Sequence, residues 1–292
     1  MEKESGSVES FDTIWFAAKD DLLNETPIKP SIFSWSLKLQ TQYFIAERIK
    51  FLEKIFSMFP SGKILNCGCG TGQWSIPFAQ AGYRVTNLDL SDNALIIVKK
   101  MFEKKNLTGE FVKGDILNMP FENETFDIIV SFGVLEHFSN IDQPISEMIR
   151  VLKPGGIFFA DVIPKRFSVQ SVETCWKTSI AVIKDLIKFR FKLIPQRFKE
   201  LKPPFYENTL SAYEYADSIK RLGCTNIRVF GVRGFPFLIL PLIIERLYVG
   251  FLKLISPLLR WFDTSSSKFS LFWGVIFSFT AIKECKNNYN NE

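Results

Sequence analysis

Between residues 63 and 162, short apolar runs alternate with segments whose apolar residues recur at helical spacing. The runs that are typical of strands are 63–67, 84–89, 109–112, 126–131 and 155–162. Helical spacing falls near 73–81, 91–105 and 141–152. Strands that alternate with helices favour a parallel sheet, which binds ligands at the carboxyl ends of its strands. The pattern therefore predicts an α/β fold.

Two helical pieces are predicted before this region, at 11–23 and 33–59. Proline residues in the stretch 26–30 separate them. The second piece carries an apolar stripe formed by Phe44, Ile45, Ile49, Leu52, Ile55, Phe56 and Phe59. Packing of this stripe against the sheet is favoured over a role as a lid above a substrate, although the two roles are compatible.

The chain changes character after Asp161. An insertion rich in Lys, Arg, Ile and Phe covers 163–210, and a helix over 209–222 then leads to a sixth strand over 223–232. A second apolar insertion covers 235–262, and a seventh strand is expected over 269–282. These patterns divide the chain into an N-terminal helical segment (1–60), a core (61–162), the rest of the sheet with helical cap insertions (163–285) and a disordered tail (286–292).

The charge of the chain is unevenly distributed. Residues 1–162 carry 16 Lys and Arg against 21 Asp and Glu, whereas residues 163–262 carry 17 against 7. The basic excess therefore belongs to the insertions, and it favours an anionic substrate or a membrane surface as a partner of that part.

The cysteines and the N-terminus indicate a cytoplasmic protein. The five cysteines include no C-x-x-C pair, which disfavours a disulfide framework and a zinc site, and no metal is predicted. Residues 1–10 are polar and lack the apolar stretch of a secretory signal.

A glycine-rich turn follows the first strand. Gly68, Gly70 and Gly72 lie between the apolar run and a helix start, an order that suits close approach of the backbone to a ligand. The second strand ends in Asp89, 17 residues after Gly72. A carboxylate at that position is typical of a site that binds a ribose diol.

Five pieces of the chain, in this order, resemble the class I S-adenosylmethionine-dependent methyltransferases, specifically their small-molecule group. The pieces are ILNCGCGTG at 64–72, NLDLS at 87–91, GDILNMPF at 114–121, FDIIVSFGVLEHF at 126–138 and VLKPGGIFF at 151–159. The resemblance covers roughly a third of the chain. It implies a Rossmann-like, doubly wound, seven-stranded sheet whose last strand is antiparallel, with N-terminal helices and a helical cap inserted after strands five and six.

The resemblance also implies S-adenosylmethionine as the cofactor. The glycine turn would hold its methionine part, Asp89 its ribose hydroxyls, and Asp115 its adenine amine, with Ile116 beside the ring. The implied cofactor-binding residues are Asn66, Gly68, Cys69, Gly70, Thr71, Gly72, Asp89, Leu90, Asp115, Ile116 and Ser131. Two structural alternatives remain open, Asp89 as the N-cap of the next helix and Asp115 as a turn residue.

The chain departs from the family at Asn66, where members usually carry Asp or Glu. That acid helps to hold the ammonium region of the cofactor. An amide can still accept a hydrogen bond, but it brings no charge. The departure leaves weaker cofactor affinity and loss of catalysis as open outcomes.

His137 is the only histidine of the chain, which excludes most Ser-His-Asp and His-ligated metal schemes. It follows Glu136 just past the fourth strand, near the place where the resemblance implies that the acceptor approaches. Either residue could take a proton from the acceptor, or both could shape the loop. The second role is favoured because many members of the resembling group rely mainly on proximity.

The same region disfavours a nucleic-acid substrate. Ser131-Phe132-Gly133-Val134 stands where methyltransferases of bases or glutamine amides typically carry Asn/Asp-Pro-Pro-aromatic. The leading hypothesis is therefore O- or C-methylation of a small or amphiphilic, lipid-linked acceptor. The alternatives are a catalytically weak, S-adenosylmethionine-binding regulatory protein and, with less support, a nucleic-acid methyltransferase. The oligomeric state is left open.

The two insertions also suggest peripheral contact with the inner face of the membrane. In 177–202, a stripe of Ile180, Ile183, Ile187, Phe191 and Ile194 is expected on one helix with Lys184, Lys188 and Lys192 at its side, which is typical of an anionic interface. The second stretch, 235–262, is long enough to cross a bilayer, but charges and prolines interrupt it. The alternative is that both stretches cover a soluble active site.

Overall fold

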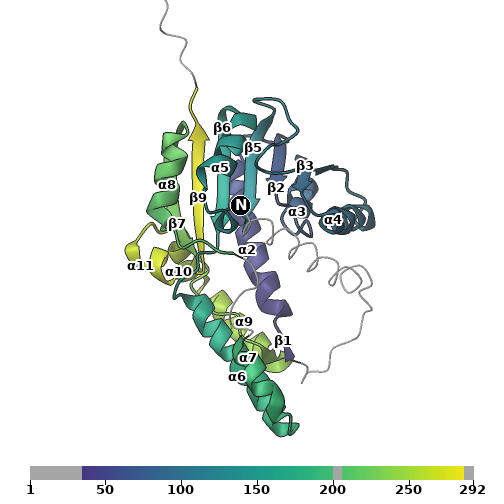
Figure 1. Cartoon of the computed structure of the whole chain (residues 1–292), viewed down its shortest axis with the longest axis vertical. Helices are drawn as coiled ribbons and strands as arrows, with labels where there is room; N and C mark the ends of the chain where they lie inside the picture. The colour runs from purple at the N-terminus through teal and green to yellow at the C-terminus, as the bar shows by residue number, and fades with distance from the viewer. Residues whose placement is uncertain (1–34, 200–205, 286–292) are drawn as a thin grey trace, which may run out of the picture.

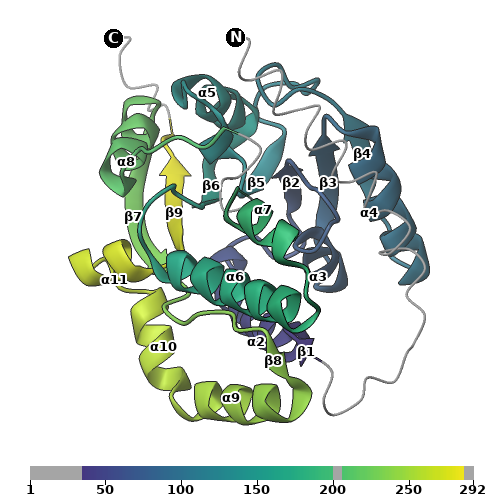
Figure 2. The same cartoon turned by 60° about the horizontal axis from the view of Figure 1, so that its bottom comes forward.

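The computed structural model describes residues 35–199 and 206–285. A seven-stranded sheet runs through it in the order β4-β3-β2-β5-β6-β9-β7 (Figures 1 and 2). Its strands are β2 (Lys63–Cys67), β3 (Arg84–Asp89), β4 (Glu110–Lys113), β5 (Phe126–Phe132), β6 (Leu152–Val162), β7 (Cys224–Val232) and β9 (Ile276–Lys283). The five neighbouring strands β4, β3, β2, β5 and β6 are parallel to one another, whereas β9 is antiparallel to both β6 and β7. The predicted fold class is confirmed, while the predicted helix 11–23 and the tail 286–292 lie outside the described residues.

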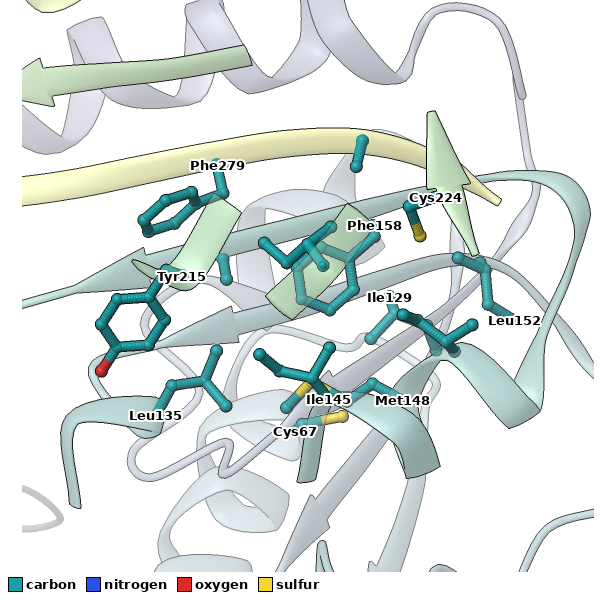
Figure 3. Close-up of a cluster of buried hydrophobic side chains, with 14 of the residues drawn as sticks. Cys67, Ile129, Leu135, Ile145, Met148, Leu152, Phe158, Tyr215, Cys224 and Phe279 are labelled. Atoms are coloured by element: carbon teal, nitrogen blue, oxygen red, sulfur yellow. The ribbon is translucent and has the colours of Figure 1, made fainter. Parts of the chain in front are cut away.

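Both faces of the sheet are buried under helices, as the continuous apolar strands require. Along β5, Ile129 packs on the side of α5 (Asp142–Val151) and α8 (Ala212–Arg221), in the cluster drawn in Figure 3. Its neighbours Ile128 and Val130 pack on the other side, with α2 (Lys38–Phe56) and α3 (Ser75–Gln80). A further helix, α4 (Asp92–Lys104), contacts β3 and β4.

Helix α2 links the sheet to the cap. Its C-terminal half packs on the sheet through Leu52 and Phe56, whereas Phe44 near its start packs with cap residues such as Phe235 and Leu252. The cluster around Phe44 also contains buried residues of β7 and β9, so the predicted packing of the stripe against the sheet is confirmed, and the N-terminal half of α2 contacts the cap in addition.

The cap consists of the segments inserted after β6 and β7. These are α6 (Val169–Ile187), η2 (Phe191–Leu193), α7 (Ile194–Lys199), α9 (Leu242–Leu254), α10 (Ser256–Asp263) and α11 (Lys268–Trp273). A two-stranded ladder of β1 (Trp35–Ser36) and β8 (Leu240–Pro241) joins α2 to this layer. The cap lies at the end of the molecule toward which the parallel strands run (Figure 1).

Buried carboxylates fasten the cap helices. Glu173 of α6 pairs with Arg233 and accepts a hydrogen bond from the backbone N–H of Phe237 (2.7 Å). Glu245 of α9 accepts hydrogen bonds from the backbone N–H groups of Leu39 (2.9 Å) and Gln40 (3.1 Å) at the start of α2. Since an acid at the first N–H groups of a helix is favourable, Glu245 joins α9 to α2.

Two expectations about the second half of the chain are wrong. The predicted strand 269–282 begins only at Ile276, because Ser267 caps the short helix α11 by accepting from the N–H of Ser270 (3.1 Å). The stripe predicted along 177–202 is broken after Ile187, where Phe189 adopts φ +54°. Asp185 then binds Arg197 (2.9 Å) and holds α7 against α6, so Phe191 and Ile194 leave the stripe.

Within the described residues, no helix is both long and apolar enough to cross a bilayer. The apolar stretch 235–262 is divided instead into β8, α9 and α10, with Pro241 preceding α9 and Pro257 in the first turn of α10.

A buried ion pair connects α2 with the carboxyl end of β6. Arg48 donates to Asp161 (2.5 Å) and to the hydroxyl of Ser278 on β9 (2.5 Å), and both charged side chains are at most 5% exposed. The guanidinium also lies 5.0 Å from the ring centre of Phe51. Burial raises the pKa of Asp161, while Arg48 acts in the opposite direction.

We expect Arg48→Ala to lower the free energy of unfolding by about 3–5 kcal/mol, because Asp161 would stay buried without its cation. The matched control is Lys50→Ala on the same helix, which removes an exposed pair with Glu47 and should cost less than about 1 kcal/mol. Urea unfolding of the two variants measures the difference, and equal losses would contradict a special role of the buried pair.

Candidate functional site

The turn after β2 is built by glycines and held by β3. Gly68, Gly70 and Gly72 have φ values of +69°, +50° and +73°. The N–H groups of Gly68 (2.8 Å) and Cys69 (3.0 Å) both donate to the carbonyl of Leu88. A Cβ at Gly68 would lie 2.6 Å from a methyl group of Val134, so the turn after β2 and the loop after β5 can only meet this closely through glycine.

Asp89 lies at the end of β3 beside this turn. Its carboxylate accepts hydrogen bonds from the N–H groups of Gly70 (2.9 Å) and Ser91 (2.9 Å). The N-cap of α4 is Ser91, whose hydroxyl accepts from the N–H of Ala94 (3.1 Å). The alternative that Asp89 is that cap is therefore excluded, and its carboxylate orders the turn instead.

A cavity of about 490 Å³ lies over the carboxyl ends of β2, β3 and β5. Two carboxylates, Asp89 and Asp115, line it, and none of the described lining residues is Lys or Arg. Apolar side chains form much of the remaining wall, including Trp74, which stacks on Phe132 at 4.7 Å between ring centres. This volume lies within the usual range for a small-molecule site, and the charge of the lining favours a cationic ligand.

Asn66 is a lining residue of this cavity whose side chain is almost fully buried. Its side-chain amide donates to the hydroxyl of Ser75 (2.8 Å), whereas its carbonyl oxygen Oδ1 is buried with no hydrogen-bond partner among the described residues. Since a buried polar atom without a partner is costly, Oδ1 indicates a place for a ligand donor.

The loop after β5 carries Glu136 and His137 in the short helix η1 (Leu135–His137). His137 Nδ1 lies 2.8 Å from the carbonyl of Tyr206, and burial lowers the pKa of the imidazole. Glu136 is buried behind Gly133, its Oε1 accepts from the N–H of Ile163 (3.1 Å), and burial raises its pKa to about 8. Both side chains thus contact backbone groups of the first insertion, at its beginning and at its end.

Most of the predicted site residues meet at the cavity. Those that line it are Asn66, Gly68, Cys69, Gly70, Thr71, Asp89, Leu90, Asp115, Ile116 and His137. Asp115 also accepts from the N–H of Leu117 (2.9 Å), so its role as a turn residue holds beside its place in the lining.

Three predicted residues do not line the cavity. Gly72 packs against Val98, and Glu136 lies behind Gly133. Ser131 is fully buried, and the lining begins with the next residue, Phe132.

Sequence reasoning missed the aromatic part of the wall, chiefly Trp74, Phe132 and Phe138. The position of Trp74 directly after the glycine turn and of Phe132 at the end of a strand could have indicated it, because both positions belong to the carboxyl edge of a parallel sheet.

Residues 65–160 match the protein family described as a methyltransferase domain. Over 108 residues the chain is 36% identical to a demethylmenaquinone methyltransferase of Bacillus mycoides, which covers 35% of this chain and 45% of that protein. Over 117 residues it is 32% identical to a sterol 24-C-methyltransferase of Schizosaccharomyces pombe, which covers 39% and 31%. Residues 65–160 are a class I S-adenosylmethionine-dependent methyltransferase domain.

The alignments span less than half the length of these two relatives, so they identify the methyltransferase domain rather than the cap. A solved structure covers more of the chain. The phosphoethanolamine N-methyltransferase 2 of Haemonchus contortus, in complex with phosphomonomethylethanolamine and S-adenosylhomocysteine, has a TM-score of 0.53 at 17% identity over 94% of this chain and 58% of that one. This likeness shows that the similarity in fold is not confined to residues 65–160 and includes the rest of the sheet.

The match to the methyltransferase domain supports S-adenosylmethionine as the cofactor of residues 65–160. The cavity fits such a molecule, because the described part of its lining offers carboxylates and no Lys or Arg to a cationic donor. The unpartnered Oδ1 of Asn66 could accept from an ammonium group, as the family acid does, although without its charge.

We expect Asp89→Asn to weaken binding of S-adenosylhomocysteine about tenfold or more, because a hydrogen bond to a charged acceptor contributes about 1.5–3 kcal/mol. Asp92→Asn is the matched control, since Asp92 lies three residues further along the chain and pairs on the surface with Lys113. Calorimetry on both variants measures the dissociation constants. Equal constants for Asp89→Asn and the parent protein would remove Asp89 from the cofactor site.

Proposed function

We propose that the chain is an S-adenosylmethionine-dependent methyltransferase that acts on a small, lipid-like acceptor by O- or C-methylation. The observation that carries this proposal is the cavity, whose lining combines the carboxylates Asp89 and Asp115 with aromatic side chains such as Trp74, Phe132 and Phe138. The carboxylates suit a positively charged methyl donor. The aromatic side chains suit an apolar acceptor.

The relatives support the acceptor class. The two curated relatives are named for a sterol and for demethylmenaquinone, which are both lipid-like molecules. Among the described residues, the cavity offers an apolar acceptor the stacked pair of Trp74 and Phe132 together with Val134. None of these side chains distinguishes an oxygen from a carbon as the methylated atom, so product analysis decides between the two.

In this proposal the chain binds the methyl donor and the acceptor, orients them toward each other and excludes water from the cavity. When bound, S-adenosylmethionine supplies a methyl group on a sulfonium. Asp89 and the glycine turn would fix the donor side, and the aromatic wall would fix the acceptor side, so that proximity provides most of the rate. The cap lies at the same end of the sheet as the cavity and would exclude water from it.

Glu136 and His137 act in this proposal by holding the loop after β5. His137 lies against the backbone carbonyls of Tyr206 and Gly133, which suits a cross-link between chain segments. Glu136 keeps a proton at neutral pH because burial raises its pKa to about 8, and it is absent from the cavity lining. A general base has to be deprotonated and within reach of the substrate. The raised pKa of Glu136 and its position outside the cavity lining both argue against that role.

The two other functions have less support. A catalytically weak regulatory protein rests on Asn66 alone, and the acceptor atom that an acid would provide is still present there as Oδ1. A nucleic-acid methyltransferase rests on the basic balance of the chain, yet the cavity lining itself carries acids and no Lys or Arg among the described residues.

The acceptor class can be tested with methyl-labelled S-adenosylmethionine and separated pools of lipid, water-soluble small molecules and RNA. We expect label to enter the lipid pool and to fall at least about tenfold with Asp89→Asn at limiting cofactor. Asp92→Asn should leave the incorporation unchanged. Label in RNA alone, or in no pool, would overturn the proposed function.

We expect Glu136→Gln to change the pH dependence of stability. In the parent protein Glu136 is protonated up to about pH 8 when folded but only up to about 4.5 when unfolded. The folded state therefore binds more protons between these values, and the free energy of unfolding falls as pH rises, by at most about 1.4 kcal/mol per pH unit. Glu136→Gln should abolish that fall, whereas the exposed Glu122→Gln should retain it. Urea unfolding across this pH range measures both, and parallel curves for Glu136→Gln and the parent protein would contradict the assignment.

A further inference from the structure

Helix α9 is apolar on its outer side as well as on its inner side. Its buried side chains, such as Val249 and Leu252, pack toward α2 and the rest of the cap. Its outer side exposes Leu247 by 72%, Phe251 by 54% and Leu254 by 79%. Because a helix that is apolar all round is normally buried, these side chains indicate a surface that is covered by something apolar.

The exposed apolar surface continues beyond α9. It includes Leu258 and Trp261 on α10, and across the β1–β8 ladder it includes Ile187, Phe189 and Phe191 at the end of α6. Figure 2 shows α6 and the α9–α10 pair on the side of the molecule turned to the viewer, with β8 between α6 and α9. We call this surface the basic apolar face. Its apolar part consists of Leu247, Phe251, Leu254, Leu258, Trp261 and the segment 187–191.

The charged side chains that the cap helices expose on the basic apolar face are Lys and Arg, and one of them, Arg260 of α10, pairs with Glu47 of α2 (3.8 Å). Each acid of the cap helices is turned inward: Glu173 and Glu245 are buried in the contacts described above, Asp185 is 4% exposed beside Arg197, and Asp263 accepts from the N–H of Arg233 (2.9 Å). The cations remain outside. Exposed Lys and Arg side chains of the face are Lys184, Lys188, Arg190, Lys192, Arg246 and Lys253.

The combination of exposed apolar side chains with cations distinguishes between three partners that could cover this face. A second copy of the chain would bring the same positive charges together, which is costly. An acidic, water-soluble partner would pair with the cations but would offer nothing to Leu247 or Leu254. A bilayer with anionic headgroups satisfies both, because apolar side chains enter the acyl boundary while Lys and Arg stay at the phosphate level.

We propose that the basic apolar face rests on an anionic lipid bilayer and holds the mouth of the methyltransferase domain toward it. The inference deepens the proposed function and rests on it in one respect, because a lipid-like acceptor would reside in that bilayer. The first insertion contacts the loop after β5, since the N–H of Ile163 at its start binds Glu136 and the carbonyl of Tyr206 near its end binds His137. A contact made by the cap is thereby connected to the loop that lines the cavity.

Vesicle flotation of the full chain tests the proposal. Vesicles of phosphatidylcholine alone are compared with an equal mixture of phosphatidylcholine and phosphatidylglycerol, at low and at high salt. We expect flotation with the anionic vesicles at low salt and about five-fold weaker binding for each cation removed, or roughly 25-fold for Arg246→Gln with Lys253→Gln. The matched control is Lys99→Gln with Lys100→Gln on α4, which removes two exposed cations outside the face and should leave flotation unchanged.

A second pair of variants tests the apolar part. Leu247→Ser with Phe251→Ser should weaken flotation at least about tenfold, whereas Met58→Ser, which alters a side chain 65% exposed beyond the end of α2, should not. Calorimetry with S-adenosylhomocysteine shows that each variant is folded and tests the cofactor site separately from the lipid contact. Absence of flotation with intact cofactor binding would overturn the membrane contact alone. Equal binding to both vesicle types, or a dimer in sedimentation that Leu247→Ser with Phe251→Ser dissolves, would overturn it as well.

Discussion

The close approach of two loops at the carboxyl edge of the sheet is the constraint on which the rest of the site depends. Because β2, β3 and β5 are parallel and in register, Cys67 lies beside both Leu88 and Ser131, and the residues that follow each strand meet at one edge. Gly68 then touches Val134 where a Cβ would lie 2.6 Å from a methyl carbon. The absence of one carbon atom thus lets the glycine turn, Asp89 and the loop after β5 surround a single cavity.

That loop is shared between the methyltransferase domain and the cap. On one side Val134 and His137 line the cavity. On the other, the carbonyl of Glu136 accepts from the N–H of Asn208 (2.7 Å), and the side-chain amide of Asn208 donates to the carbonyl of Phe138 (2.9 Å). The insertion after β6 therefore begins and ends on the loop that would face the acceptor. A change in the cap can reach the cavity through two residues that need no base function.

Features that depend on contacts between different segments of the chain could not be predicted from the sequence. The glycine spacing and the apolar runs predicted the sheet from 63 to 162 because both are local features, and the antiparallel last strand came from the family resemblance. The break of α6 after Ile187 depends on Asp185 and Arg197, which the helical period does not reveal. Ser131 was assigned to the lining from its place at the end of a predicted strand, yet β5 continues to Phe132 and moves the lining on by one residue.

The same carboxylates that hold the cap also set the character of its surface. Glu173, Asp185 and Glu245 are each buried in contacts with backbone N–H groups or Arg side chains, so the acids of α6 and α9 are used inside the molecule. Their Lys and Arg neighbours, such as Lys184 and Arg246, remain at the surface and make it basic. A cap that needed only to cover a soluble site would gain from polar side chains at Leu247 and Leu254, since apolar groups in water are unfavourable. The cap helices therefore place their acids inside, where they bind the rest of the molecule, and their cations and apolar side chains outside. This distribution suits a cap that meets an anionic interface.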